Sequence, residues 1–366
     1  MCIISVQFIH GLKLSELFYK EIIKNLLEKE YPSLEYAAAL IGRGSEVLGF
    51  DDEISTDHHW GPRLQLFLKE SNYEKYKKSI KEFFSSNLPL TFHGYSTNWS
   101  EPDPNDSNNQ FLKPKKNGPI NHRIEIHTVQ RYLKQYLAMG SLNAKEIDWF
   151  TIPEQKLLEF TSGTVFFDNL GELTHAREIL HYYPDSIWKL RIIAQWSRIG
   201  QEIAFVGRTG GIGDDLGSRI EASRLVRYIM QMAFMLEKEY ITYEKWFGVA
   251  FSRLPIARKL KPILLDVLKE NQWDQREKLL VDAYLLLARK HIQLGLIPNI
   301  EIKAIRYYNR PQLIVPIQKI TRELVKGIDA RYKDIRYQMF GTINQFVDSS
   351  NLLDPELSKK YKTFFD

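Results

Sequence analysis

The first 140 residues alternate between short apolar runs and amphipathic stretches. Apolar residues spaced three and four apart predict a helix over residues 12–29. The apolar runs 36–41 and 63–69 are typical of buried central strands, and alternation of apolar and polar residues over 122–129 indicates a further strand. This pattern predicts an α+β domain with a small mixed sheet. Its other expected elements are a short helix over 45–48, a helix over 73–84 and a strand over 88–95.

From about residue 130 onward, apolar residues recur almost throughout at helical spacing. We therefore predict two domains, residues 1–140 and a mainly α-helical bundle over residues 141–366. The run 165–168 is interpreted as a strand or hairpin. The glycine-rich segment 205–217 is interpreted as a loop between helices, because it lacks the Gly-Lys-Ser/Thr ending of a phosphate-binding loop. The expected helices are 130–139, 154–161, 173–181, 186–206, 216–239, 257–269, 273–293 and 316–346.

Length and composition narrow the class of protein. A chain of 366 residues is long enough for two domains, and 44% hydrophobic with 26% charged residues is ordinary for a soluble globular protein. No apolar run approaches the ~20 residues of a membrane helix, and residues 1–9 lack the pattern of a signal peptide. The sole cysteine, Cys2, excludes an internal disulfide and a cysteine-based zinc site. We expect a cytoplasmic protein without membrane contact.

The net charge of +5 favours anionic ligands but falls short of the dense basic stripe of a nucleic-acid-binding protein. The basic run 113–116 lies in a polar loop, residues 98–119. Such a run is usually a solvated surface feature. Contact with a substrate or a nucleic acid is the alternative, and a loop of this length could act as a lid.

Gly44 and Ser45 follow the first predicted strand, and eleven residues separate this pair from Asp57. Backbone N–H groups at a glycine-rich turn leading into a helix bind phosphate oxygens. A carboxylate near the next strand can hold Mg²⁺ against the same phosphates. The layout predicts a nucleotide site in which Gly44 and Ser45 contact phosphate and Asp57 binds the metal. The alternative is a tight turn with a helix N-cap, in which Asp57 only caps the turn before Trp60.

The same residues carry a family resemblance. The Gly-Ser pair followed at this distance by Asp57-x-His59 resembles the nucleotidyltransferase signature, in which two acidic residues stand at i and i+2. More closely, the string GSEVLGFDDEISTDHHWGPR resembles an uncharacterised, mostly bacterial family known only as a domain of unknown function. Residues 148–168, 213–219 and 243–251 extend this resemblance through much of the chain. It implies a nucleotidyltransferase-like domain followed by a helical domain.

The resemblance also implies a metal site, with one departure. His59 occupies the position of the second metal carboxylate and shares a face with Asp57 if this stretch is extended. It is expected to bind metal or phosphate, or alternatively to be a hydrogen-bonded turn histidine; imidazole suits Zn²⁺ or Mn²⁺ better than Mg²⁺. Glu125 best matches the third acidic residue, which completes the metal site or accepts the proton of the attacking hydroxyl. Its alternative is an exposed strand residue paired with Arg123 or His127.

Four cationic residues are candidate nucleotide contacts. Arg63 continues the face of Asp57 and His59 along the second strand and could clamp a phosphate or a carboxylate. In the helical half, the resemblance implies that Arg208, Arg219 and Lys245 face the nucleotide, and surface salt bridges are the alternative.

These residues predict transfer of a nucleoside monophosphate from a nucleoside triphosphate, ATP in the first instance, to a hydroxyl acceptor, with Mg²⁺ or Mn²⁺ as the metal. The expected acceptor is a small molecule rather than a nucleic acid. The chain could instead bind or sense a nucleotide without turnover. A third interpretation is a nucleotidyltransferase-like partner in an RNA- or tRNA-directed system.

Overall fold

The computed structural model describes residues 8–54, 56, 59–106, 108–143 and 148–364, and the chain divides into two compact units. Unit 1 comprises Met1–Ile147 and Lys156–His181, and unit 2 comprises Asp148–Gln155 and Tyr182–Asp366. Unit 1 contains a small mixed sheet with helices, and unit 2 is mainly helical, so the predicted α+β class is confirmed. In the described part of the chain, no helix is long and apolar enough to cross a membrane.

The sheet of unit 1 has four strands in the order β5-β2-β1-β6. β1 (Tyr36–Leu40) pairs antiparallel with β2 (Arg63–Leu68) on one side and with β6 (Thr164–Asp168) on the other. β5 (Arg123–His127) pairs parallel with β2, with Arg63 opposite Arg123. The sheet is therefore mixed, as the sequence predicts.

One face of the sheet supports the hydrophobic core of unit 1. A nearly continuous helix runs through α1 (Gly11–Phe18), a π-helical turn (Tyr19–Ile23) and α2 (Lys24–Glu30), and it packs on this face together with α3 (Glu70–Asn87). Buried leucine and isoleucine side chains of β2 and β5 meet them there. The expected helices 12–29 and 73–84 thus form, with slightly different ends.

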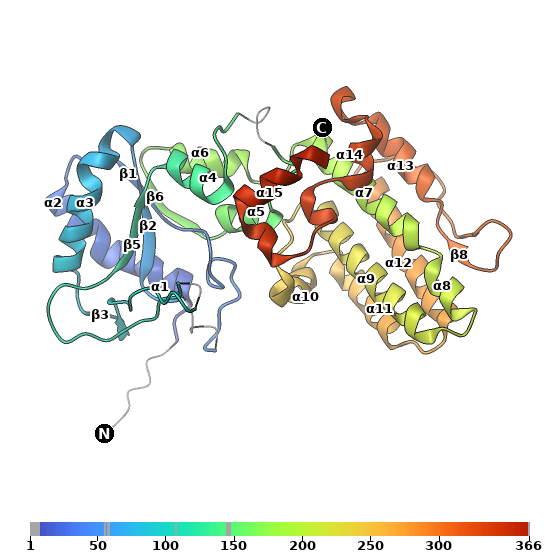
Figure 1. Ribbon diagram of the computed structural model, residues 1–366, viewed down its shortest axis with the longest axis horizontal. Helices are drawn as coiled ribbons and strands as arrows, with labels where there is room; N and C mark the ends of the chain where they lie inside the picture. Colours follow the sequence, from blue (N-terminus) through green and yellow to red (C-terminus); the bar gives the residue numbers. More distant parts are fainter. Residues whose placement is uncertain (1–7, 55, 57–58, 107, 144–147, 365–366) are drawn as a thin grey trace, which may run out of the picture. The chain divides into compact units, whose positions relative to one another are not determined.

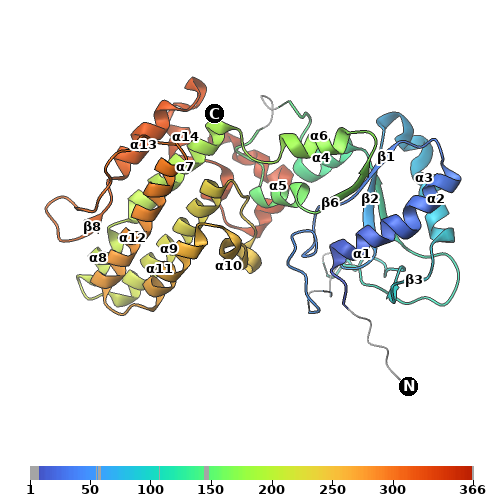
Figure 2. The ribbon, with the colours of Figure 1, turned by 180° about the vertical axis from the view of Figure 1, so that it is seen from behind.

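The other face carries the polar side chains of β2 and β5 and is covered by α4 (Val129–Leu137). α5 (Glu154–Thr161) and α6 (Glu172–Ile179) complete this region, and α6 packs against both α4 and β6. Figures 1 and 2 show α4, α5 and α6 on the opposite side of the strands from α1 to α3.

Two expected elements of unit 1 do not form. Residues 45–48 lie in a turn rather than a helix. The expected strand over 88–95 is reduced to a separate hairpin of β3 (Thr91–Phe92) and β4 (Tyr95–Ser96), which does not join the sheet. His93 and Gly94 in its turn have φ angles of 47° and 84°, so the chain reverses where the sequence pattern continued as one strand.

The observed division also differs from the expected boundary at residue 140. The run at 165–168 lies in β6, which pairs with β1 and so belongs to the sheet of unit 1. Its strand partner is more than a hundred residues earlier in the sequence, and local periodicity carries no information about such pairing. Unit 1 therefore includes residues 156–181, which the sequence pattern assigned to the helical domain.

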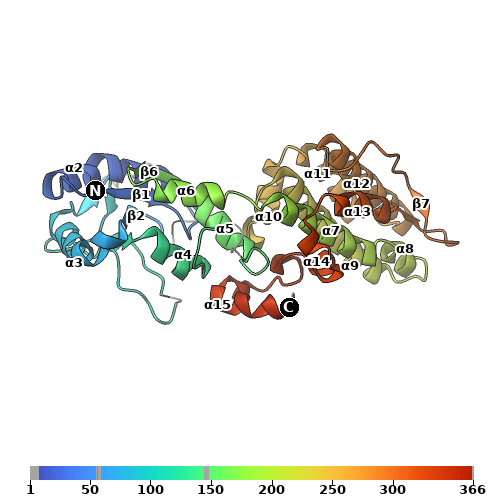
Figure 3. The same cartoon turned by 90° about the horizontal axis from the view of Figure 1, so that it is seen from above.

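Unit 2 is built around three long helices that pack side by side: α7 (Asp185–Glu202), α9 (Asp215–Glu237) and α12 (Trp273–Gln293). Figure 3 shows the shorter helices around them. These are α8 (Phe205–Gly210), α10 (Glu244–Arg253), α11 (Ala257–Lys269), α13 (Ile317–Lys326) and α14 (Ile335–Phe340). The segment 205–217 thus contains a short helix, and Asp214 caps α9 by accepting a hydrogen bond from the Gly217 N–H at 2.8 Å.

The expected long helix over 316–346 is broken into short pieces. α13 ends at Lys326, with Gly327 as its C-cap, and α14 is preceded by a 3₁₀ turn (Ala330–Tyr332) and followed by another (Ile343–Gln345). Further short elements complete the chain: a hairpin of β7 (Ile305–Arg306) and β8 (Leu313–Ile314), a 3₁₀ turn (Ser350–Leu353), α15 (Pro355–Ser358) and a final 3₁₀ segment (Lys359–Phe364).

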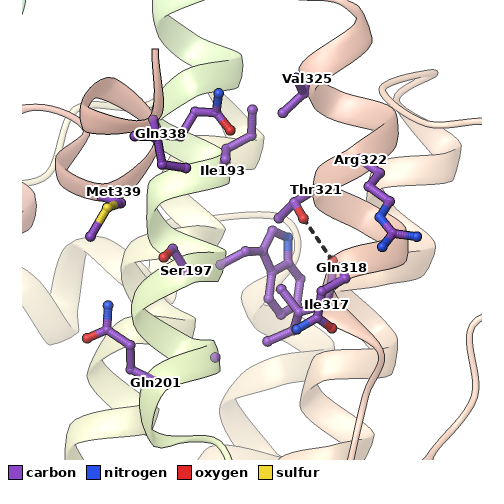
Figure 4. Close-up of a pocket in the computed structure, with 13 residues that line it drawn as sticks. Ile193, Ser197, Gln201, Ile317, Gln318, Thr321, Arg322, Val325, Gln338 and Met339 are labelled. Carbon is purple, nitrogen blue, oxygen red and sulfur yellow. Dashed lines mark hydrogen bonds between the residues drawn. The ribbon is translucent and has the colours of Figure 1, made fainter. Parts of the chain in front are cut away.

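A groove of about 550 Å³ lies between α7, α13 and α14. In Figure 4, Ile193 and Ser197 of α7 face Ile317 and Thr321 of α13 across it. The apolar floor is closed by helix packing, since Ile193 is only 3% exposed. Ile335 and Met339 of α14, which are 62% and 48% exposed, form its open apolar rim.

Candidate functional site

The sheet brings the ends of its strands together at one edge of unit 1. β1 ends at Leu40, beside Thr164 at the start of β6. Because β2 is antiparallel to β1 and parallel to β5, Arg63 and Arg123 at the starts of those strands lie at the same edge. The turn containing Gly44 leaves β1 here. We call this region, from the turn to the first residues of β2 and β5, the strand edge.

Arg63 is committed to a buried ion pair. Its Nε and Nη2 donate to Glu46 Oε1 at 3.0 and 2.6 Å, and Nη2 also donates to the Arg43 carbonyl at 2.6 Å. Burial alone would lower the pKa of Arg63, but the charge and hydrogen bond of Glu46 outweigh it and raise the pKa. Arg63 therefore binds a carboxylate of the protein itself.

Glu46 is the feature that the sequence pattern did not single out. Its side chain is 1% exposed, and Oε2 has no hydrogen-bond partner among the described residues. A buried carboxylate oxygen without a donor is costly, and a cation or a water molecule can satisfy it. Only its position between a Gly-Ser turn and a strand arginine could have indicated its importance.

The Gly44-Ser45 turn is shaped by this ion pair. Gly44 has a φ angle of 142°, which favours glycine. A Cβ atom at Gly44 would lie 2.4 Å from Glu46 Oε2 and 2.6 Å from Arg63 Nη2. Glycine is thus required at this position, because the charged side chains of Glu46 and Arg63 approach its backbone closely. The helix over 45–48, whose N-terminus was expected to face a phosphate, is absent.

Glu125 lies on the same sheet face as Arg63 and Gln65. It pairs with Arg123 Nη2 and with His127 Nε2, each at 3.4 Å, and its side chain is 40% exposed. Burial would raise the pKa of Glu125, but the hydrogen bond from His127 and the neighbouring positive charges outweigh it and hold the pKa at about 2. A carboxylate this acidic stays ionised and is a weak base at neutral pH.

His59 has a φ angle of 54°, so it lies in a left-handed turn rather than in an extended strand. Its Nδ1 is hydrogen-bonded to Arg123 Nη1, which brings the imidazole to the start of β5. Arg123 is partly buried, and burial together with the charge of Arg63 lowers its pKa. His59, Arg63, Arg123 and Glu125 are therefore collected at the strand edge. Asp57, the expected metal ligand, lies outside the described residues.

Two tyrosines of α4 cover the polar face next to the strand edge. The Tyr132 ring lies 5.2 Å from that of His127, and Tyr136 stacks on Tyr132 at 5.1 Å. The Tyr136 hydroxyl donates to Glu159 of α5, whose backbone carbonyl accepts the Gly42 N–H at 2.8 Å. Burial, followed by the charges of the two nearby glutamates, raises the pKa of Tyr132. These contacts fix the beginning of the turn, and the helical pattern of 130–139 gave no sign of them.

The three cations expected in the helical half lie in unit 2. Arg219 Nε donates to Asp215 at 2.7 Å, which matches the surface salt bridge considered as its alternative. Arg208 is exposed near the Phe205 ring, and Lys245 is exposed over the Trp246 ring at 4.9 Å. Their contact with a nucleotide stays a prediction.

The residues that could hold a divalent metal are few. Within the described part of the chain, no three His, Cys, Asp or Glu side chains form a group suited to a metal ion. Two carboxylates of the strand edge nevertheless fit the oxygen ligands of Mg²⁺: Glu125, which stays ionised, and Glu46, whose Oε2 receives no hydrogen bond from any described residue.

A family model matches a part of the chain that carries the sequence resemblance. Residues 149–247 match the model of a domain of unknown function, DUF4037, which confirms similarity to an uncharacterised family. The crystal structure of a nucleotidyltransferase-like protein from Exiguobacterium sibiricum 255-15 aligns with 82% of this chain and 97% of its own, at 12% identity and a TM-score of 0.31. A likeness at this identity and TM-score carries no conclusion about the fold or the mechanism of this chain. No protein of curated function matches the chain.

Proposed function

We propose that unit 1 binds the triphosphate of a nucleotide at the strand edge and transfers the nucleoside monophosphate to a hydroxyl acceptor. The observation that supports this most directly is the sheet topology. It collects the Gly44 turn, two strand arginines and the Glu125 carboxylate at one edge, although they are up to about 80 residues apart in the chain.

In this proposal the acceptor oxygen attacks the α-phosphorus, the bond from that phosphorus to the bridging oxygen breaks, and pyrophosphate leaves, while the hydroxyl proton passes to water or to the leaving pyrophosphate. Arg123 and His59 contact phosphate oxygens, since they lie side by side at the start of β5. Glu125 binds the metal rather than the acceptor proton, because Arg123 and His127 hold its carboxylate in the ionised form and lower its pKa. Mg²⁺ or Mn²⁺, when bound, would neutralise the triphosphate, with Asp57 as a further ligand. ATP is the first nucleotide to test.

A second candidate is nucleotide binding without turnover. The ion pair between Arg63 and Glu46 favours this candidate, because the guanidinium that was expected to bind phosphate already binds a carboxylate of the protein. The presence of His59 in place of a carboxylate points in the same direction, because imidazole is a less suitable ligand for Mg²⁺.

Calorimetric titration of ATP, GTP, CTP and UTP, each with Mg²⁺, with Mn²⁺ and with a chelator, tests the proposal. Metal-dependent binding that Glu125→Gln weakens is expected, and Glu82→Gln, an exposed glutamate on α3, is the matched control. Release of pyrophosphate in the presence of small hydroxyl compounds would favour transfer. Tight binding without pyrophosphate would favour the second candidate, and no binding of any nucleotide would refute both.

A further inference from the structure

Residues 305–314 form a hairpin that projects from the helices of unit 2 (Figures 1 and 2). β7 and β8 pair through Ile305 with Ile314 and Arg306 with Leu313. The Tyr307 N–H donates to the Gln312 carbonyl at 2.8 Å, so the hairpin narrows to a short tip.

The base of the hairpin is fixed to the helices. Glu277 of α12 accepts the Leu313 N–H through Oε1 at 2.9 Å. Gln312 is buried and donates through Nε2 to the Gly207 carbonyl of α8 at 3.3 Å. A tip mounted on such a base is presented to solvent in a defined orientation.

The tip combines an exposed aromatic ring with cations. Tyr308 is 83% exposed and has a φ angle of 55°, a left-handed conformation that is unfavourable for a tyrosine. Its ring is held at 4.8 Å from that of Tyr307. Arg306 and Arg310 on either side are exposed. A strained backbone that turns a large ring outward is typical of a binding surface rather than of packing.

The surrounding segment has an unusual charge. Residues 302–322 contain no Asp or Glu, whereas the whole chain carries 45 acidic residues against 50 Lys and Arg. The five cations of this segment are Lys303, Arg306, Arg310, Lys319 and Arg322, of which Lys303 is paired with Glu301 at 3.5 Å. Arg322 lies on α13 at the groove in Figure 4, so the positive charge continues from the hairpin along the next helix. Such a stretch attracts a polyanion.

We propose that this hairpin binds single-stranded nucleic acid, with a base stacked on Tyr308 and adjacent phosphates held by Arg306 and Arg310. Single-strand recognition combines cations that follow the backbone with aromatic rings that stack on bases, and the tip offers both within a few residues. A duplex would not supply the unstacked base. This binding surface lies in unit 2 and does not depend on the nucleotide site proposed in unit 1.

Fluorescence anisotropy with labelled oligouridylate and oligothymidylate of about 12 nucleotides, at two salt concentrations, tests the proposal on the full chain. We expect Tyr308→Ala to weaken binding about tenfold and Tyr308→Phe to retain it, because the ring alone stacks. The double variant Arg306→Gln/Arg310→Gln should lower the salt dependence by about two counterions. Tyr243→Ala combined with Arg258→Gln, at exposed positions elsewhere in unit 2, is the matched control.

Because the tip is exposed, these variants should melt at the temperature of the parent protein. Binding of RNA, of DNA or of both, weakened in Tyr308→Ala and in the double arginine variant but not in the control variant, would support the proposal and identify the nucleic acid. Three outcomes would overturn it: no binding at the lower salt, equal loss in the control variant, or equal affinity for polyglutamate that does not depend on Tyr308.

Discussion

Arg63 holds Glu46 through two hydrogen bonds to one carboxylate oxygen, and the other oxygen of Glu46 is buried without a partner among the residues that the structure describes. The pair joins the start of β2 to the turn that leaves β1. It therefore supports the backbone of the candidate site and also places an unsatisfied carboxylate oxygen there.

Removal of Arg63 should destabilise unit 1. Arg63→Met leaves the charge of Glu46 buried without its partner, so the free energy of unfolding should fall by about 3 to 5 kcal/mol. Chemical denaturation measures this loss. The double variant Arg63→Met/Glu46→Gln should recover part of it, because it no longer buries a charge. Equal losses in the single and double variants would show that packing, rather than charge, explains the role of Arg63.

Gly44 should not tolerate a side chain. Gly44→Ala combines a φ angle of 142° with contacts of 2.4 and 2.6 Å to Glu46 and Arg63, so we expect a loss of about 2 to 4 kcal/mol. Gly118→Ala is the control, because Gly118 has a φ angle of 76° but no atom within 4 Å of the added Cβ. The melting temperature of Gly44→Ala should lie well below that of Gly118→Ala. The reverse order would contradict the role of the ion pair in shaping the turn.

The elements that local periodicity could predict are those with continuous apolar patterns. The strands at Tyr36–Leu40 and Arg63–Leu68 and the helix at Trp273–Gln293 lie where the sequence places them. The prediction assigned β6 to the helical domain, whereas it pairs with β1 in the sheet of unit 1, because its partner strand is distant in the chain. α10 was not predicted, since its apolar positions are interrupted by Gly248 and by exposed Val249.

The candidate site was predicted in part. Arg63 and Glu125 share a sheet face, as alternation along two adjacent strands implies. His59 was expected on an extended stretch with Asp57, but it lies in a left-handed turn and contacts Arg123. Glu46 was missed because its role depends on a buried ion pair between the turn after β1 and the start of β2, which residue spacing cannot reveal.

The metal preference of the site should respond to His59→Asp. An aspartate tolerates the left-handed backbone, can pair with Arg123 as the imidazole does, and supplies an oxygen ligand. Nucleotide binding should therefore rise in Mg²⁺ relative to Mn²⁺, as measured by titration of ATP with each metal. His93→Asp is the control, because His93 has a similar φ angle of 47° in the separate β3–β4 hairpin. An unchanged metal preference would place His59 outside the metal's ligands.

Asp57 should be needed for metal-dependent binding and dispensable for folding. Asp57→Asn keeps the size of the side chain and removes its charge, so ATP binding in Mg²⁺ should be lost while the melting temperature changes little. Differential scanning fluorimetry and titration on the same sample separate the two effects. A large fall in melting temperature with binding retained would make Asp57 a cap of the turn before Trp60.

Glu277 should make the stability of unit 2 depend on pH. Burial, partly opposed by the hydrogen bond from Leu313, raises the pKa of Glu277 to about 7, above its ordinary value of 4.5. The folded state therefore binds the proton more tightly than the unfolded state. The stabilisation is fully present below pH 4.5 and is lost as the pH rises through about 7.

Glu277→Gln stays neutral at every pH. Between pH 4.5 and about 7, its free energy of unfolding should therefore rise by about 1 to 3 kcal/mol relative to that of the parent protein. Urea denaturation at a series of pH values measures the difference, with exposed Glu301→Gln as the control for the loss of one charge. A difference between parent and Glu277→Gln that does not change with pH would show that the pKa of Glu277 is the same in the folded and unfolded states.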